Sequence, residues 1–553
     1  MAFKRLDDSI AVSPQISLGD VARAAREGYR SIISNRPDGE EPGQPKASAI
    51  QAEAERNGLA FAHIPIESGK AGDKDADAMK AALATLPGPV LAFCRSGARS
   101  TTLWALANAD DAEPRVLIGR AAAADHDIAA LEPELRRRGK ASSRTYDVVI
   151  VGGGAAGIAT ASSILKRNSK VTIAIVDAAK EHFYQPGWTM VGAGVFTPEQ
   201  TRKTEAEVMP KGVDWLQIAA SGFEPERNAV TLEDGRTLTY RVLVAAPGLR
   251  LAWEKIEGLE ATLGRNGVTS NYRYDLAPYT YRLVQELKKG RALFSQPPMP
   301  IKCAGAPQKA MYLSCDIWRE AGTLPGIDVE FHNAGAVLFG VAHYVPALME
   351  YIEKYGIDLC LESNLVAVDG DRKTATFAQK KDGETVRVER TFDMLHVVPP
   401  QVSHEWVAKS PLAAKTGFIA VDEPTLRHKK YENVFALGDA AATSNAKTAA
   451  AARKQAPVVA VNVLAALDGK PPVADYDGYG SCPLTVERGK IVLAEFGYGG
   501  KLLPSFPRWF IDGSKPTRAA WYLKERLLPA IYWHAMLKGR EPMAAPHMIG
   551  KAA

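Results

Sequence analysis

The sequence predicts an α/β fold over nearly the whole chain of 553 residues. Short apolar runs of strand length alternate with segments whose apolar residues recur at helical spacing, which is the pattern of layered α/β domains. A glycine-rich turn follows a buried strand at residues 152–157, as in a dinucleotide-binding βαβ unit. The hydrophobic content of 46% and the charged content of 24% are those of a folded globular protein.

Charge, cysteine content and hydropathy exclude several classes of protein. A net charge of +5 over this length does not require a nucleic-acid partner, and we expect none. Five cysteines without a CxxC pair, and ten histidines without ligand spacing, predict neither a disulfide scaffold nor a metal site. The first residues lack the apolar stretch of a secretory signal, and no run of about 18 apolar residues predicts a membrane span. We therefore expect a cytoplasmic location.

A domain boundary is predicted near residue 140. Residues 121–138 have apolar residues at helical spacing and a basic end, and Gly139 then predicts a helix stop. The small polar residues up to 144 are typical of a linker. We therefore assign residues 1–140 to a first domain, residues 145–475 to a second part, and residues 476–553 to a C-terminal tail.

The first domain carries a cysteine loop at the end of a predicted strand. Strands are predicted at 30–34, 60–66 and 90–93, with helices at 47–57 and 74–86 between them. The last strand leads into the loop that begins at Cys94, and a helix follows at 101–107. Backbone N–H groups and a helix N-terminus can hold an anion there and lower the pKa of the thiol. Arg99 would add a bidentate clamp for an oxyanion. Cys94 and Arg99 are therefore candidate catalytic residues.

This domain resembles a small bacterial family related to dual-specificity protein phosphatases, which occurs fused to enzymes of sulfur metabolism. The resemblance rests on the cysteine loop, on Ser13-Pro14-Gln15, and on the segment 35–39 after a strand. Four residues separate Cys94 from Arg99, one fewer than in those phosphatases, and rhodaneses use this shorter spacing to carry a persulfide. Persulfide handling, phosphatase activity and non-catalytic anion binding all remain open for this domain.

The second part opens with a dinucleotide-binding fingerprint. The strand 147–151 leads into Gly152, Gly154 and Gly157, which supply a tight turn, room for a pyrophosphate and close helix–strand packing. A helix follows at 158–166, and a second strand ends at Asp177, whose carboxylate can hold ribose hydroxyls.

Two later segments resemble flavoproteins built from two dinucleotide domains. Residues 434–439 form a predicted strand that ends in Gly-Asp, and in such proteins an aspartate at the position of Asp439 binds the ribityl chain of FAD. Residues 242–248, ending at Gly248, resemble a second conserved stretch of that superfamily. Where a nicotinamide domain would place its glycine loop, the region near 265–390 has a cysteine and a proline at 303–307. We therefore expect FAD as the cofactor, and an electron donor other than NAD(P)H.

Over residues 145–545 the chain is similar to the sulfide:quinone oxidoreductase family. The longest matching stretch is Lys302-Cys303-Ala304-Gly305-Ala306-Pro307-Gln308-Lys309, and others lie at 181–186, 191–194 and 476–483. The resemblance implies FAD as cofactor, Cys303 as a redox cysteine, and sulfide or a small thiol or persulfide together with a quinone as reaction partners. It adds Gln185, Pro186 and Lys447 to the candidate cofactor-binding residues.

The chain departs from the expected family pattern at the second redox cysteine. We expect that cysteine directly after Gly438-Asp439, where this chain has Ala440. Cys315 is too far along a helix from Cys303, at about 1.5 Å per residue, to replace it. For Cys482 we favour a structural role and leave a redox role open.

The tail predicts a surface that contacts a membrane. A helical pattern near 516–538, bent at Pro529, combines aromatic, aliphatic and basic residues. Family members contact membranes in this region, which implies a tail that faces a membrane and its quinone. Packing on the domain and a contact between identical chains are the alternatives.

The residues and the resemblance together predict FAD-dependent oxidation of sulfide or a related sulfur species, with reduction of a quinone and an N-terminal persulfide-handling domain. One alternative is a flavoprotein with another substrate, because Ala440 replaces the expected cysteine. The other is a phosphatase or signalling module with a flavin redox sensor.

Overall fold

The computed structural model describes residues 3–112, 114–143, 145–381 and 383–550. The chain divides into two compact units. One comprises Met1–Thr145 with Val230–Thr239, and the other comprises Tyr146–Ala229 with Tyr240–Ala553. Both contain helices packed on mainly parallel sheets, so the predicted α/β fold is confirmed.

The first unit is a five-stranded sheet covered on both faces. The strand order is β1-β2-β5-β3-β4, and only β1 is antiparallel to its neighbour. The strands are β1 (Lys4–Arg5), β2 (Ile10–Ser13), β3 (Ser31–Ser34), β4 (Ala60–His63) and β5 (Val90–Phe93). Ile32 and Ile33 point to opposite faces because side chains alternate along a strand.

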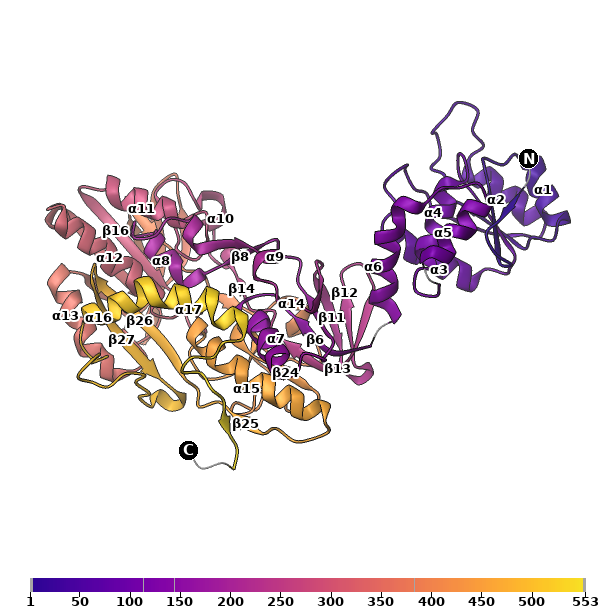
Figure 1. Ribbon diagram of the computed structural model, residues 1–553. Helices are drawn as coiled ribbons and strands as arrows, with labels where there is room; N and C mark the ends of the chain where they lie inside the picture. Colours follow the sequence, from indigo (N-terminus) through magenta and orange to yellow (C-terminus); the bar gives the residue numbers. More distant parts are fainter. Residues whose placement is uncertain (1–2, 113, 144, 382, 551–553) are drawn as a thin grey trace. The chain divides into compact units, whose positions relative to one another are not determined.

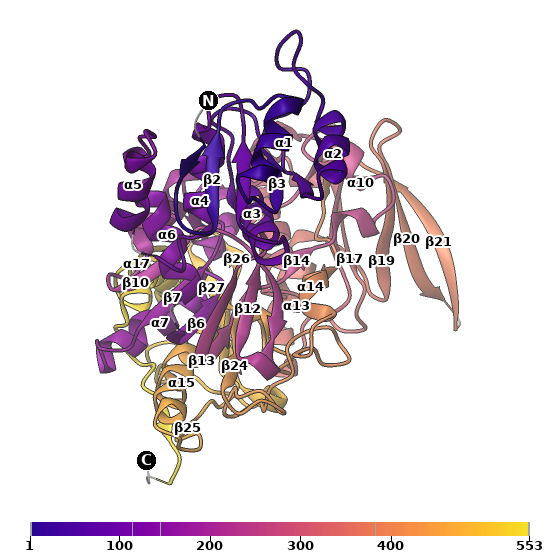
Figure 2. The ribbon, with the colours of Figure 1, turned by 90° about the vertical axis from the view of Figure 1, so that its right-hand side faces the viewer.

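Two sets of helices cover these faces (Figure 2). One face carries α1 (Leu18–Arg26) and α2 (Ala47–Arg56); the other carries α3 (Asp73–Thr85), α4 (Ala98–Ala107) and α5 (Pro114–Ala123).

The predicted helix over residues 121–138 and its predicted end at Gly139 are wrong. The segment 121–138 is not one helix: α5 ends at Ala123 and α6 runs from Glu132 to Ser143, through Gly139. A Cβ atom at Gly139 would lie 2.6 Å from the carbonyl oxygen of Ala109. This glycine therefore permits close packing against a neighbouring segment instead of ending the helix.

The second unit begins with the sheet that carries the glycine-rich turn. Its strand order is β10-β7-β6-β13-β12-β11, with β24 paired to β13. The outer strands are β10 (Val213–Leu216), β11 (Ala220–Glu224) and β12 (Ala229–Leu232). The strands that position the site are β6 (Thr145–Val151), β7 (Ile173–Val176), β13 (Thr237–Ala245) and β24 (Val434–Ala436). Helices α7 (Ala155–Arg167) and α15 (Ala449–Leu467) pack against each other beside this sheet (Figure 1).

A second parallel sheet lies within residues 268–396. Its order is β15-β22-β16-β17-β18, formed by β15 (Val268–Thr269), β16 (Gly290–Gln296), β17 (Ile327–Asn333), β18 (Asp358–Cys360) and β22 (Met394–His396). Helices α12 (Ala306–Glu320) and α13 (Val345–Tyr355) contribute to its core. An antiparallel sheet of β19 (Ser363–Asp369), β20 (Thr374–Lys381) and β21 (Glu384–Thr391) extends from its side (Figure 2).

The C-terminal part adds a hairpin and an irregular helix. The hairpin consists of β26 (Gly480–Glu487) and β27 (Lys490–Phe496). The predicted helix at 516–538 is α16 (Arg518–Tyr522), a π-helical segment Leu523–Leu527, and α17 (Leu528–His534). The irregularity precedes Pro529, which has no N–H to donate to the preceding turn. Among the described residues, no helix has the length and apolar character needed to cross a bilayer.

Candidate functional site

A large cavity in the second unit collects most of the predicted cofactor-binding residues. Its walls come from the first sheet of this unit, from the start of α12, from β26 and β27, and from the C-terminal helix. The predicted residues on these walls are Gly154, Asp177, Gln185, Pro186, Gly248, Cys303, Asp439 and Lys447.

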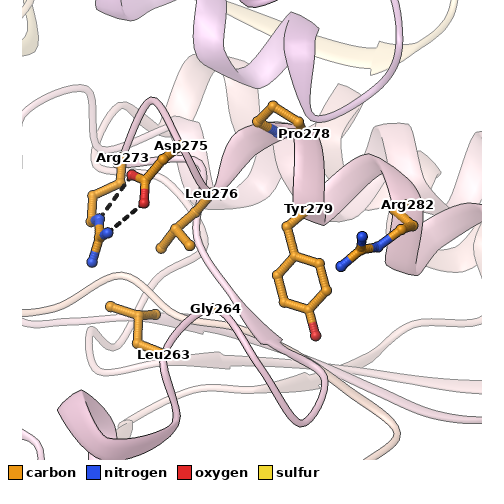
Figure 3. A pocket seen from close by; sticks show the side chains of 8 residues that line it. All are labelled: Leu263, Gly264, Arg273, Asp275, Leu276, Pro278, Tyr279 and Arg282. Atoms are coloured by element: carbon orange, nitrogen blue, oxygen red, sulfur yellow. Dashed lines mark hydrogen bonds and ion pairs between the residues drawn. The ribbon is translucent and has the colours of Figure 1, made fainter.

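Figure 3 shows a separate pocket beside α11 (Ala277–Glu286), lined by Arg273, Asp275 and Tyr279 among others. Its Arg273 is already paired with Asp275, and no cysteine lines it. The large cavity, by contrast, is lined by Cys303 and by most of the predicted cofactor-binding residues.

The glycine-rich turn has the geometry of a phosphate cradle. Gly152 has a φ of 106°, and a Cβ there would overlap the carbonyl oxygen of Ala246. A Cβ at Gly157 would overlap the carbonyl oxygen of Gly152. Gly154, in contrast, has no atom within 4 Å of a Cβ position, so the space at the N-terminus of α7 is open. Gly152 and Gly157 shape the turn, and Gly154 leaves room for a ligand phosphate.

Two carboxylates lie next to this turn, and one of them was not predicted. Asp177 accepts the Gly153 N–H at 2.5 Å. Glu205 borders the same side of Gly153, where a Cβ atom would lie 3.0 Å from its Oε1, and it is 1% exposed. One of its oxygens contacts His182 at 3.2 Å, and the other has no hydrogen-bond partner among the described residues. A buried carboxylate oxygen without a partner, on the wall of a cavity, fits ribose hydroxyls. The residues present therefore fit a dinucleotide.

The turn after β24 is held from two sides. The backbone N–H of Gly438 donates to Gln455 of α15 at 2.9 Å. The ammonium of Lys447 donates to the carbonyl oxygens of Asp439 at 2.8 Å and Ala441 at 2.7 Å. The Lys447 carbonyl in turn accepts the Cys303 N–H at 2.7 Å. Lys447 therefore ties the turn of Asp439 to the loop of Cys303.

The structure places a second thiol directly beside Cys303. The sulfur atoms of Cys303 and Cys482 are 3.8 Å apart. A Cβ at Gly305 would overlap the Cys482 sulfur, so this glycine lets β26 approach the cysteine loop. Although Ala440 stands where the second redox cysteine is expected, Cys303 has a neighbouring thiol in Cys482. The structural role favoured for Cys482 stays a prediction, and this contact supports the redox role that the sequence left open.

The local charges divide the two thiols into a nucleophile and its partner. The contact with Cys482, and then the Lys309 ammonium at 3.1 Å from the sulfur, hold the pKa of Cys303 well below its usual range. The same contact and burial hold the pKa of Cys482 well above its usual range. Burial alone would lower the pKa of Lys309, but the Cys303 thiolate outweighs it and raises this pKa. Cys303 is therefore the thiolate of the pair.

The backbone of Cys303 is also unusual. Its φ of 52° lies in the left-handed region, which few residues other than glycine adopt. The Tyr272 hydroxyl donates to the Lys302 carbonyl at 3.0 Å and to the Cys303 carbonyl at 3.1 Å. These bonds hold the thiolate in a fixed position on the cavity wall.

The C-terminal helix adds a third lysine that the sequence did not single out. Lys524 lies in the π-helical segment, is 3% exposed, and lines the cavity. Burial and the charge of Lys309 lower the pKa of Lys524 to about 7. Its ammonium donates to the Pro186 carbonyl at 3.3 Å. Lys524 can therefore gain or lose a proton near neutral pH next to the thiol pair.

The other cysteines of this unit are structural. Cys315 lies in the apolar core around α12, where burial raises the pKa of its thiol. Cys360, Glu330 and His332 come within metal-binding distance of one another. Glu330 is already bound by Arg291 and Arg390, each at 3.1 Å, and by His332. Because the Glu330 carboxylate is already paired with two arginines and bound to His332, we assign no metal to this cluster.

The cysteine loop of the first unit forms a second candidate site. Cys94 is fully buried at the end of β5, and the Gly97 N–H points to its sulfur at 3.1 Å. Gly97 has a φ of 95° and starts α4. Arg99 does not face an open anion position, because its guanidinium is paired with the carboxylate of Glu40. The predicted oxyanion clamp is thus occupied by the chain itself.

Comparison with known proteins assigns both parts of the chain. The family described as "Pyridine nucleotide-disulphide oxidoreductase" matches residues 146–285, and the phosphatase-like domain of "Beta-lactamase hydrolase-like protein" matches residues 2–111. A Beta-lactamase hydrolase-like protein of Xylella fastidiosa is 42% identical over 111 residues, which is 20% of this chain and 26% of that protein.

Most of the chain is similar to mitochondrial sulfide:quinone oxidoreductases. The Dictyostelium discoideum protein is 42% identical over 396 residues, covering 71% of this chain and 86% of its own length. The Mus musculus protein is 37% identical over 71% of this chain and 87% of its own length. The structure of the sulfide:quinone oxidoreductase from Aquifex aeolicus shares the fold, with a TM-score of 0.60, 19% identity, and coverage of 71% and 92%. The protein is an oxidoreductase of flavin type, and the chain belongs to the sulfide:quinone oxidoreductase family.

Proposed function

We propose that this protein oxidises sulfide at the Cys303–Cys482 pair and passes two electrons through FAD to a quinone. The observation that carries the proposal is the 3.8 Å contact between the sulfur of Cys303, which lines the dinucleotide cavity, and the buried sulfur of Cys482 behind it. Two adjacent thiols can store two electrons by opening and closing a bond between them. The alternative hypothesis, a flavoprotein with another substrate, was based on the missing second cysteine. Cys482 supplies a second thiol beside Cys303, so that basis is removed.

The residues of the cavity support FAD as the dinucleotide. Gly154 leaves room for its pyrophosphate, Asp177 and Glu205 face the ribose position, and Asp439 lies nearer Cys303. When bound, FAD accepts the electron pair of the thiols and delivers it to the quinone. Burial raises the pKa of Asp439, and the nearby Lys447 partly offsets this effect.

The thiol chemistry follows from the unequal pKa values of the two cysteines. In the oxidised pair, hydrosulfide attacks the Cys482 sulfur, and the bond to Cys303 breaks. Cys303 is the better leaving group because its thiolate is stabilised by Lys309. Cys482 then carries a persulfide, and an external thiol takes the outer sulfur to form its own persulfide. The two cysteines remain as reduced thiols. Their bond would reform with the loss of two electrons and two protons, and bound FAD would be the electron acceptor.

Anaerobic titration with sulfide tests the proposal. We expect sulfide to bleach the visible flavin absorption of the wild type. Cys303→Ser and Cys482→Ser should keep their flavin but lose this bleaching. Cys360→Ser is the matched control and should respond like the wild type, since Cys360 lies at the far edge of the second sheet. Wild-type bleaching by Cys482→Ser would show that Cys303 works without this partner.

For the first unit we propose that Cys94 carries sulfane sulfur. An external persulfide would transfer its outer sulfur to the Cys94 thiolate and leave as a thiol, with no net oxidation. The support is the position of the Cys94 sulfur at a strand end, where it accepts the Gly97 N–H at 3.1 Å. Mass spectrometry of Cys94 after incubation with glutathione persulfide would show a gain of one sulfur atom, and Cys94→Ser should not gain it.

We further propose that the C-terminal part contacts the membrane that holds the quinone. Trp509 is 86% exposed and Phe510 is 53% exposed, and both follow Phe506, which lines the cavity. Arg508 and Lys515 add positive charge nearby in the chain. Exposed aromatic side chains flanked by basic residues suit the headgroup layer of a bilayer.

A further inference from the structure

Arg99 in the cysteine loop of the first unit is bound by a carboxylate from another loop. Its Nη1 lies 2.6 Å from Oε1 of Glu40, and its Nη2 lies 2.7 Å from Oε2. The Arg99 side chain is 11% exposed, and its Nη1 also donates to the Ile66 carbonyl at 2.5 Å. This is the bidentate geometry with which arginine binds a carboxylate or a phosphate.

Glu40 is held in this position from its other side. The Nε of Arg36, whose side chain is 3% exposed, donates to Oε2 of Glu40 at 2.8 Å. The same guanidinium binds Glu41 at 2.9 Å, and Arg95 of the cysteine loop binds Glu41 at 2.8 Å. Two pairs of opposite charges therefore fasten the loop of Glu40 to the loop of Cys94.

The carboxylate of Glu40 is charged throughout the physiological pH range. The hydrogen bonds from Arg99, and then those from Arg36, lower the pKa of Glu40 to about 2. The hydrogen bond with the Glu40 carboxylate in turn raises the pKa of Arg99. The guanidinium thus lies between a permanent negative charge and the thiol.

Two buried hydroxyls next to the cysteine loop in the fold lack partners. Ser13, whose carbonyl accepts the Cys94 N–H, is 1% exposed, and Ser100 in the first turn of α4 is fully buried. Neither hydroxyl has a hydrogen-bond partner among the described residues. These hydroxyls do not compete with Glu40 for Arg99, so Glu40 is the anion that occupies the clamp.

We infer that the Glu40 carboxylate occupies the anion-binding position of Arg99. It thereby prevents phosphate-like dianions from binding beside Cys94, while a persulfide can still form on the Cys94 sulfur. A dianion would have to displace Glu40 from Arg99, or lie beside an uncompensated carboxylate. A persulfide needs only the thiolate and short polar contacts. The substrate class rests on the proposed sulfur-carrying role of Cys94, but the exclusion of dianions can be tested without it.

The test measures protection of Cys94 from alkylation in the full-length protein. The rate of iodoacetamide labelling is followed by mass spectrometry of the Cys94 peptide, with increasing inorganic phosphate. Glu40→Gln removes the charge and keeps the shape of the side chain. We expect it to reach half-protection at roughly tenfold lower phosphate than the wild type, since a charge-assisted bidentate pair no longer competes.

Glu41→Gln is the matched control, because it removes a neighbouring carboxylate that binds Arg36 and Arg95 but not Arg99. It should respond to phosphate like the wild type. An equal gain in both variants, or none in Glu40→Gln, overturns the inference. Strong protection of the wild type by phosphate overturns it without any variant.

The sulfur-carrying role is decided separately by the persulfide incubation. Failure of Cys94 to gain sulfur there would leave the phosphate result intact.

Discussion

Replacing Lys309 with methionine should remove most of the stabilisation of the Cys303 thiolate. The ammonium lies 3.1 Å from the sulfur; Lys309 is buried and Cys303 is half-buried on the cavity wall. At an effective dielectric constant of about 20, two unit charges at this distance interact by about 5 kcal/mol. At about 1.4 kcal/mol per pH unit, the upper limit of the change is a rise of nearly 4 units in the pKa of Cys303. Burial and the Lys309 charge both lower the pKa of Lys524, so in the variant Lys524 protonates more easily and recovers part of this stabilisation; we therefore expect a rise smaller than the upper limit.

The assay is the pH dependence of Cys303 alkylation, measured on its peptide by mass spectrometry. The pKa of Cys303 is depressed in the folded wild type, so its labelling should reach a plateau well below pH 8. Labelling of Lys309→Met should rise only above that pH. Lys309→Arg is the control, since it keeps the charge and should remain near the wild-type profile. A profile of Lys309→Met within half a unit of the wild type would refute the electrostatic reasoning.

Three further outcomes can be checked. The pKa of Lys524 is lowered to about 7, so Lys524→Met should slow flavin reduction by sulfide below neutral pH, where the wild type carries the charge. The two proteins should converge as pH rises and the wild-type lysine loses its proton. Gly154→Val should remove flavin while leaving folded apoprotein, because the space is open. Gly157→Val should instead abolish soluble protein, because the new side chain overlaps the Gly152 carbonyl. Replacing Trp509 and Phe510 with serine should weaken sedimentation with anionic vesicles at least about tenfold, at about 1–3 kcal/mol per buried aromatic, without changing bleaching by sulfide.

Truncation of the C-terminal tail is expected to disturb the folded core and not only membrane contact. Tyr532, Trp533 and Leu537 are buried, and Ser162 of α7 donates to the Leu537 carbonyl at 2.9 Å. Lys524 belongs to the cavity wall. Removing the chain beyond about residue 500 would expose this core, so point substitutions of exposed aromatics are the better probe of membrane contact.

The local pattern of the sequence determined the fold class and the dinucleotide turn. Strand, glycine turn, helix and acidic residue follow one another within about 30 residues, so their spacing alone places Gly152, Gly154, Gly157 and Asp177. The cysteine loop of the first unit could be predicted for the same reason, because Cys94 and Arg99 are only five positions apart in the sequence.

The tertiary structure alone decided which residues meet at each site. Cys482 lies 179 residues from Cys303, and only the approach of β26 to Gly305 brings their sulfurs together. Lys524 lines the same cavity, but it lies in a helical segment whose sequence pattern predicted a membrane-contacting surface. Glu40 reaches Arg99 across 59 residues and occupies a clamp that the local motif leaves open for a ligand. Contacts of this kind depend on how distant segments pack, and no periodicity or spacing along the chain records that packing.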